Sequence, residues 1–76
     1  MEPEEIDARG LSCPQPLLLT KSALLNVPAA AEIAVLADDP LAAVDLAVFC
    51  ERAGHRLLGS DPLGDGVTRY RIRKAG

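Results

Sequence analysis

Two cysteines, Cys13 and Cys50, carry the most reactive side chains of this sequence. A deprotonated cysteine sulfur is a strong nucleophile, so an accessible thiol is a candidate for group transfer. Cys13 lies in the stretch LSCPQP, with Gly10 just upstream and no histidine beside it. Any activation of this sulfur therefore has to come from its position in the fold rather than from an adjacent histidine base.

The prolines that follow Cys13 predict where a helix begins. Proline is tolerated in the first helical turn, so Pro14 is expected at position N1 and Pro16 at N3, with Cys13 as the N-cap. The Gln15 amide is then expected to face the sulfur. A thiolate at the positive end of a helix is stabilised, and Arg9 adds a positive charge, so we expect the pKa of Cys13 to lie below the free-cysteine value of about 8.5.

A purely structural interpretation of Cys13 stays open, in which it is a small residue at a helix start and the prolines are only start signals. Cys50 differs, because its spacing from Leu46, Phe49 and Ala53 is helical and free cysteine is often buried. We predict that Cys50 belongs to the core.

Other polar residues give weaker signals. One histidine, His55, and two distant cysteines do not form a recognisable zinc pattern, and we expect no metal and no cofactor. Asp38 and Asp39 are better explained as helix capping than as acid–base catalysis. Gly10 suits the positive φ of a tight turn between strand and helix.

Hydrophobic periodicity and turn residues predict six elements that position these side chains. The expected α/β fold is a two-layer sandwich of order β-α-β-α-β-β, with a four-stranded mixed sheet and both helices on one face. Leu17, Leu18, Leu24 and Leu25 are expected to form the apolar stripe of the first helix, with Lys21 at its edge. The predicted ranges are a strand at 6–8, a helix from 14 to before Pro28, a strand at 32–38, a helix at 39–53, a strand at 55–60, a turn at 61–66 and a strand at 67–74.

Alternation in the last strand predicts its two faces. Tyr70 and Ile72 are expected beneath the helices, whereas Arg69, Arg71 and Arg73 are expected on the open sheet face. These arginines are either a solvated surface or a binding surface for an acidic partner or an RNA backbone. Because Phe49 and Tyr70 are the only aromatic residues, base stacking on the protein is disfavoured and direct nucleic-acid binding is not expected.

Length and composition indicate a single domain over residues 1–76. The apolar content of 49% and charged content of 25% are typical of a globular protein, with a net charge of −3. Acidic residues, among them Glu2, Glu4 and Glu5, lie near the start of the chain, and basic residues lie near its end. No apolar run approaches the roughly 20 residues that span a bilayer, so we expect no association with a membrane. Two cysteines without a secretory signal favour free thiols, so we expect the protein in the cytoplasm.

The segment IDARGLSCPQP, residues 6–16, resembles the signature of the TusA-like, or SirA-like, sulfur-carrier family. The similarity continues through residues 37–40, Phe49-Cys50 and residues 70–74, and so covers nearly the whole chain. It implies a sulfurtransferase-type carrier in which Cys13 accepts a persulfide sulfur from a cysteine desulfurase or another donor. An acceptor protein then receives the sulfur for tRNA thiolation, molybdenum cofactor assembly or sulfur oxidation. The expected supporting residues are Arg9, Gly10, Pro14, Gln15 and Pro16.

Two alternatives from other functional classes remain. The chain could be a regulatory protein-binding module that uses its open sheet face, with Cys13 serving only as a helix start. It could also be a thiol switch that pairs Cys13 with Cys50, which the expected burial of Cys50 disfavours.

Overall fold

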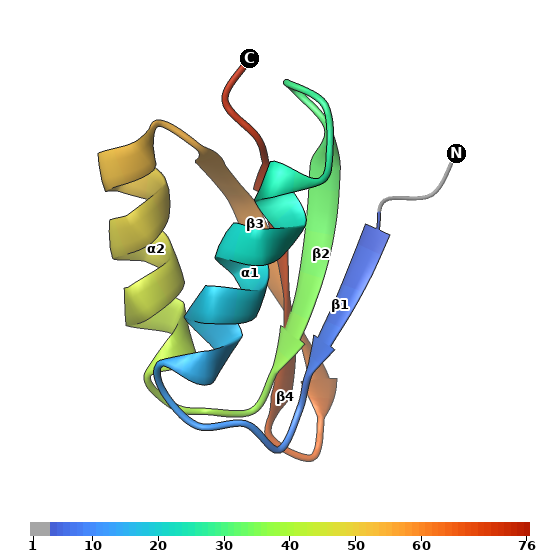
Figure 1. Cartoon of the computed structure of the whole chain (residues 1–76). Helices are drawn as coiled ribbons and strands as arrows, with labels where there is room; N and C mark the ends of the chain where they lie inside the picture. Colours follow the sequence, from blue (N-terminus) through green and yellow to red (C-terminus); the bar gives the residue numbers. More distant parts are fainter. Residues whose placement is uncertain (1–3) are drawn as a thin grey trace.

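The fold is a two-layer α/β sandwich. The computed structural model describes residues 4–76, so residues 1–3, including the acidic Glu2, lie outside the described chain. The elements are β1 (Glu4–Ala8), α1 (Gln15–Leu25), β2 (Glu32–Ala37), α2 (Ala42–Ala53), β3 (Arg56–Gly64) and β4 (Val67–Arg73). Figure 1 shows both helices on one face of the sheet, which confirms the predicted fold class.

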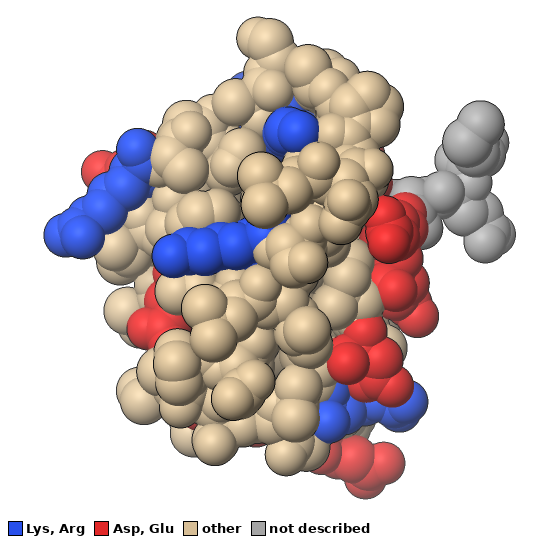
Figure 2. All heavy atoms as spheres, in the orientation of Figure 1, with Lys and Arg blue, Asp and Glu red and all other residues tan. Residues whose placement is uncertain are grey.

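The four strands form one mixed sheet in the order β1-β2-β4-β3. β1 pairs with β2 in parallel, and the register places Ala8 opposite Ala37. The β2–β4 and β3–β4 pairs are antiparallel. Acidic side chains gather along the exposed β1 edge in Figure 2, and such charges oppose pairing with another strand. Neither helix of residues 4–76 is long and apolar enough to cross a bilayer.

The core lies between the helices and the sheet. Ile33, Val35, Leu46 and Ile72 are fully buried, and Tyr70 is only 6% exposed. The predicted inward face of the last strand is therefore confirmed. Cys50 is also confirmed as a core residue, because it is only 2% exposed.

The buried face of α1 differs from the predicted leucine stripe. Its buried residues are Pro16, Thr20, Ala23 and Leu24, whereas Leu18 is 50% exposed and Leu25 is 83% exposed. The buried stripe is thus centred on small side chains, which allow the helix to approach the sheet closely. The Thr20 hydroxyl donates to the Pro16 carbonyl at 2.8 Å, which satisfies the one polar side chain on this face.

The segment predicted as a turn at residues 61–66 is mostly strand. β3 continues to Gly64, and only Asp65 and Gly66 form the turn, with φ values of 53° and 76°. Positive φ at both positions is the geometry for which Asp-Gly is favoured in two-residue hairpins. Pro62 fits because β3 is an edge strand with an irregular register between Pro62 and Gly64.

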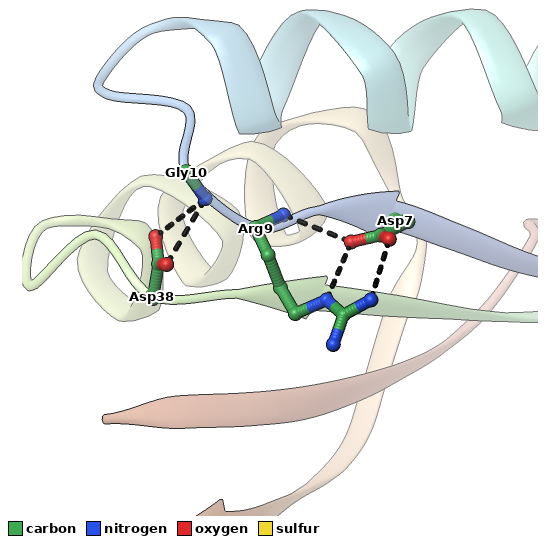
Figure 3. Close-up of polar contacts among 4 residues, drawn as sticks. All are labelled: Asp7, Arg9, Gly10 and Asp38. Carbon is green, nitrogen blue, oxygen red and sulfur yellow. Dashed lines mark hydrogen bonds and ion pairs between the residues drawn. The ribbon is translucent and has the colours of Figure 1, made fainter. Parts of the chain in front are cut away.

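An ion pair between Asp7 and Arg9 lies at the C-terminal end of β1. The Arg9 guanidinium donates from Nε to Asp7 Oδ1 at 2.9 Å and from a terminal nitrogen to Oδ2 at 2.8 Å, and the Arg9 amide also donates to Oδ1 at 3.1 Å (Figure 3). These hydrogen bonds stabilise the ionised carboxylate and lower the pKa of Asp7 to about 2.

Replacing Leu46 tests the core. Leu46→Ala should lower the free energy of unfolding by about 2 to 5 kcal/mol, because it removes a fully buried side chain. Leu25→Ala is the matched control in α1, and its exposed position predicts a change within about 0.5 kcal/mol. Urea unfolding of both variants measures the difference; equal losses would contradict this description of the core.

Replacing Arg9 tests the ion pair. In the parent protein, NMR titration of the Asp7 carboxyl carbon should show a midpoint near 2, and Arg9→Ala should raise it toward the ordinary value of 3.8. Because the folded-state pKa is depressed, the stabilisation by this pair is complete above pH 3.8 and is lost as pH falls through about 2. Arg52→Ala, on α2, should leave the Asp7 midpoint unchanged. An unaltered midpoint in Arg9→Ala would refute the pairing.

Candidate functional site around Cys13

The loop that carries Cys13 is held by the chain that follows β2. The Gly10 amide donates to both carboxylate oxygens of Asp38, at 3.1 and 3.0 Å (Figure 3). Gly10 has a φ of 78°, which confirms its predicted turn conformation. The Asp38 carboxylate thereby fixes the point where the chain leaves β1 and turns toward α1.

Asp39 holds the same loop nearer the cysteine. Its Oδ2 accepts a hydrogen bond from the Cys13 amide, while its Oδ1 accepts one from the Leu41 amide at 2.9 Å. One carboxylate therefore connects the start of α2 to the cysteine loop. The sequence predicted a helix from residue 39 with Asp39 as a capping residue, but α2 begins at Ala42 with Leu41 as its N-cap.

The start of α1 is displaced by one residue from the prediction. Pro14 is the N-cap, Gln15 is N1 and Pro16 is N2, so Cys13 lies outside the helix. Both prolines still occupy the turn where an amide has no intrahelical acceptor. The Gln15 amide donates to the Ser12 carbonyl at 2.9 Å, so the prediction that it faces the sulfur is wrong. The Cys13–Pro14 peptide bond is cis.

The Cys13 thiol donates a hydrogen bond to Asp45 Oδ2 at 2.9 Å. This bond, the loss of hydration and the negative charges of Asp45 and Asp39 raise the pKa of Cys13. The predicted lowering by the helix end is therefore wrong. Arg9 does not supply the expected positive charge either, because its guanidinium is paired with Asp7.

Asp45 is the residue that sequence reasoning missed. It lies in the first turn of α2, 32 positions after Cys13. The only signal in the sequence was an acidic residue near the start of a helix, which is common because it complements the helix dipole. Nothing in the spacing indicated that its carboxylate would meet the sulfur.

A groove of about 440 Å³ is lined by residues of both helices, and Asp45 is one of them. Basic side chains cross this helical face in Figure 2. Lys21 also lies over the Phe49 ring, with its Nζ 5.5 Å from the ring centroid. The groove-lining residues are Leu17, Lys21, Asp45, Val48, Phe49, Arg52 and Ala53.

Cys50 and His55, the other candidate residues, make contacts that do not involve the Cys13 thiol. Cys50 is buried, and loss of hydration raises its pKa. His55 Nδ1 accepts a hydrogen bond from the Ala75 amide at 2.9 Å, which gives this histidine a structural contact at the end of the sheet. Within residues 4–76 no group of three or more metal-ligating side chains converges.

The open sheet face gathers the arginines of β4, as predicted, but with an acidic partner from the chain itself. Asp61 on β3 lies 3.6 Å from the Arg69 guanidinium and 3.2 Å from Arg71 Nε. A Cβ atom at Gly59 would lie 2.5 Å from the Arg71 side chain, so the glycine leaves room for it to lie across the sheet. Arg73 is exposed at the end of the strand.

The geometry describes a nucleophile that is accessible but not yet ionised. Cys13 is exposed, its amide is bound, and its proton is directed at a carboxylate. A sulfur in this state reacts after the proton leaves, and the surrounding charge decides how readily this happens.

Comparison with known proteins supports a family assignment. The fold is similar to that of the SirA-like protein from Desulfitobacterium hafniense, with a TM-score of 0.83 and 27% sequence identity over 95% of this chain and 97% of that one. The family model described as Sulfurtransferase TusA matches residues 4–74. This match includes the cysteine loop, both helices and all four strands, and the chain therefore belongs to the TusA family.

Proposed function

We propose that this protein is a sulfur carrier that accepts a persulfide sulfur on Cys13 and passes it to an acceptor protein. The observation that carries the proposal is the exposed thiol of Cys13 on an anchored loop, in a chain of the TusA family. A cysteine desulfurase or another sulfane-sulfur donor would load the thiol. The family assignment supports transfer as the general role, and the relay serves tRNA thiolation, molybdenum cofactor assembly or sulfur oxidation.

A carrier needs one sulfur that two successive partners can reach. Cys13 meets this requirement because it is exposed, whereas Cys50, on the buried face of α2, is only 2% exposed. The loop is held by its main chain, through Gly10 and Cys13, so the side chain can accept another sulfur atom without losing these anchors. Free thiols of this kind suit a reducing compartment, and we place the carrier in the cytoplasm.

The remaining candidate residues receive supporting roles in this proposal. Gly10 forms the turn, and Pro14 and Pro16 fix the first turn of α1 beside the cysteine. Arg9 stabilises the end of β1 through Asp7, and Gln15 closes the turn with Ser12. The whole chain acts as one domain. In this proposal a partner protein binds the open sheet face that carries Arg69, Arg71 and Arg73.

Mass spectrometry of the intact protein tests the assignment of Cys13. After incubation with a cysteine desulfurase and cysteine, or with polysulfide, the parent should gain the mass of one sulfur atom, and a reductant should remove it. Cys13→Ser should lose this adduct completely, because it removes the accessible thiol. Cys50→Ser should keep the adduct, although the added hydroxyl in the core is expected to reduce stability by about 1 kcal/mol.

Circular dichroism of both variants separates loss of the thiol from loss of the fold. An adduct that persists in Cys13→Ser would overturn the assignment. A folded parent protein that never gains sulfur from either donor would instead favour the regulatory protein-binding module. A disulfide between Cys13 and Cys50 after mild oxidation would favour the thiol switch.

A further inference from the structure

The contact between Cys13 and Asp45 is unexpected for a protein whose sulfur must react. A nucleophilic cysteine is usually activated by a neighbouring positive charge, which favours the thiolate. Here the charged groups that bind Cys13 are the carboxylates of Asp45 and Asp39. The resting site therefore favours the protonated and less reactive form of the thiol.

The carboxylates of Asp39 and Asp45 bind different groups, the first backbone amides and the second the sulfur. Asp39 binds the Cys13 amide and the Leu41 amide, so both of its oxygens serve the backbone. Asp45 Oδ2 binds the sulfur itself. Asp45 is thus the carboxylate whose removal would change the thiol while leaving the loop anchors in place.

In the part of the chain that the structure describes, residues 4–76, no ion pair to Asp45 is formed. Lys21 and Arg52 line the same groove, but the ion pairs found within residues 4–76 do not join either of them to Asp45. Lys21 instead lies over Phe49. Asp45 is only partly buried and lines this groove, so a positive group from another molecule can approach it.

We propose that Asp45 is a specificity-determining residue for the sulfur transfer: it holds the Cys13 proton in the free protein and makes Cys13 prefer reagents whose reacting end is positively charged. The inference rests on the proposed function. A cationic group beside the donor sulfur pairs with Asp45, which removes the acceptor of the thiol hydrogen bond and offsets the negative charge that disfavours the thiolate.

The transfer step that follows balances without an added oxidant or reductant. The Cys13 proton passes to water, and the thiolate attacks the outer sulfur of a donor persulfide, R–S–SH. The bond between the two donor sulfurs breaks as the new sulfur–sulfur bond to Cys13 forms. The donor leaves as a thiolate and takes up a proton, so R–S–SH and the Cys13 thiol become R–SH and the Cys13 persulfide.

The first test is the pH dependence of Cys13 alkylation by iodoacetamide, measured with Cys50→Ser in the background so that one thiol reports. Asp45→Asn should move the alkylation midpoint to lower pH and increase the rate at pH 7 several-fold, because it removes the carboxylate at the sulfur. Asp45→Glu should restore a raised midpoint. Glu51→Gln, which removes the same charge from the same helix, should behave like the parent.

The second test measures the preference for charge with two small disulfides, cationic cystamine and anionic dithiodipropionate. Thiol–disulfide exchange at Cys13 should be faster with cystamine in the parent, and the ratio of the two rates should fall several-fold in Asp45→Asn but not in Glu51→Gln. Asp39 remains in every variant, so a small preference should persist.

An alkylation midpoint or a rate ratio that Asp45→Asn leaves unchanged would overturn the role of Asp45. Neither measurement uses a sulfane-sulfur donor, so both are independent of the loading test on Cys13→Ser. Failure of loading with a shifted midpoint would count against the carrier function, whereas normal loading with an unshifted midpoint would count against Asp45 alone.

Discussion

The position of Cys13 depends on the parallel pairing of β1 with β2. Because the strands run in the same direction and Ala8 is opposite Ala37, the chain leaves both strands at one edge of the sheet. Gly10 and Asp38 meet there and form the first anchor of the cysteine loop. An antiparallel pairing would send the two chain segments to opposite edges, and the carboxylate would not reach the loop.

The same edge also brings together the starts of the two helices. In Figure 1 the segments that lead into α1 and α2 lie side by side below the helices, and Asp39 joins them by binding both the Cys13 and Leu41 amides. The first turn of α2 then lies close enough for Asp45 to meet the sulfur. The site is therefore a product of topology, since its residues come from segments that are far apart in the chain.

Sequence-based prediction succeeded where the structure depends on residues close together in the chain and failed where it depends on contacts between distant residues. The element order, the burial of Cys50 and the turn at Gly10 depend on local patterns, and these predictions were correct. The Asp65-Gly66 hairpin was also a local signal, but it was merged with the prolines and glycines around it. The contact of Cys13 with Asp45 spans 32 positions and depends on how two helices meet, so no local pattern contained it. The buried face of α1 was misjudged for a related reason: a leucine pattern shows where apolar groups lie, whereas close packing on a sheet selected Thr20 and Ala23.

The pKa of Cys13 is raised rather than lowered because two electrostatic effects act on the sulfur from different distances. A helix N-terminus acts as about half a positive charge spread over the first turn, and its influence declines quickly beyond that turn. Cys13 lies one position outside the cap, which Pro14 occupies, and each proline removes an amide that could have faced the sulfur. Asp45 offers a full negative charge in direct contact with the thiol, and Asp39 adds another nearby. The carboxylates therefore outweigh the helix end in the free protein. A cation brought to Asp45 would offset the negative charge in direct contact with the thiol and leave only that of Asp39 to oppose the helix end, so the balance at the sulfur shifts toward the thiolate once such a partner is bound.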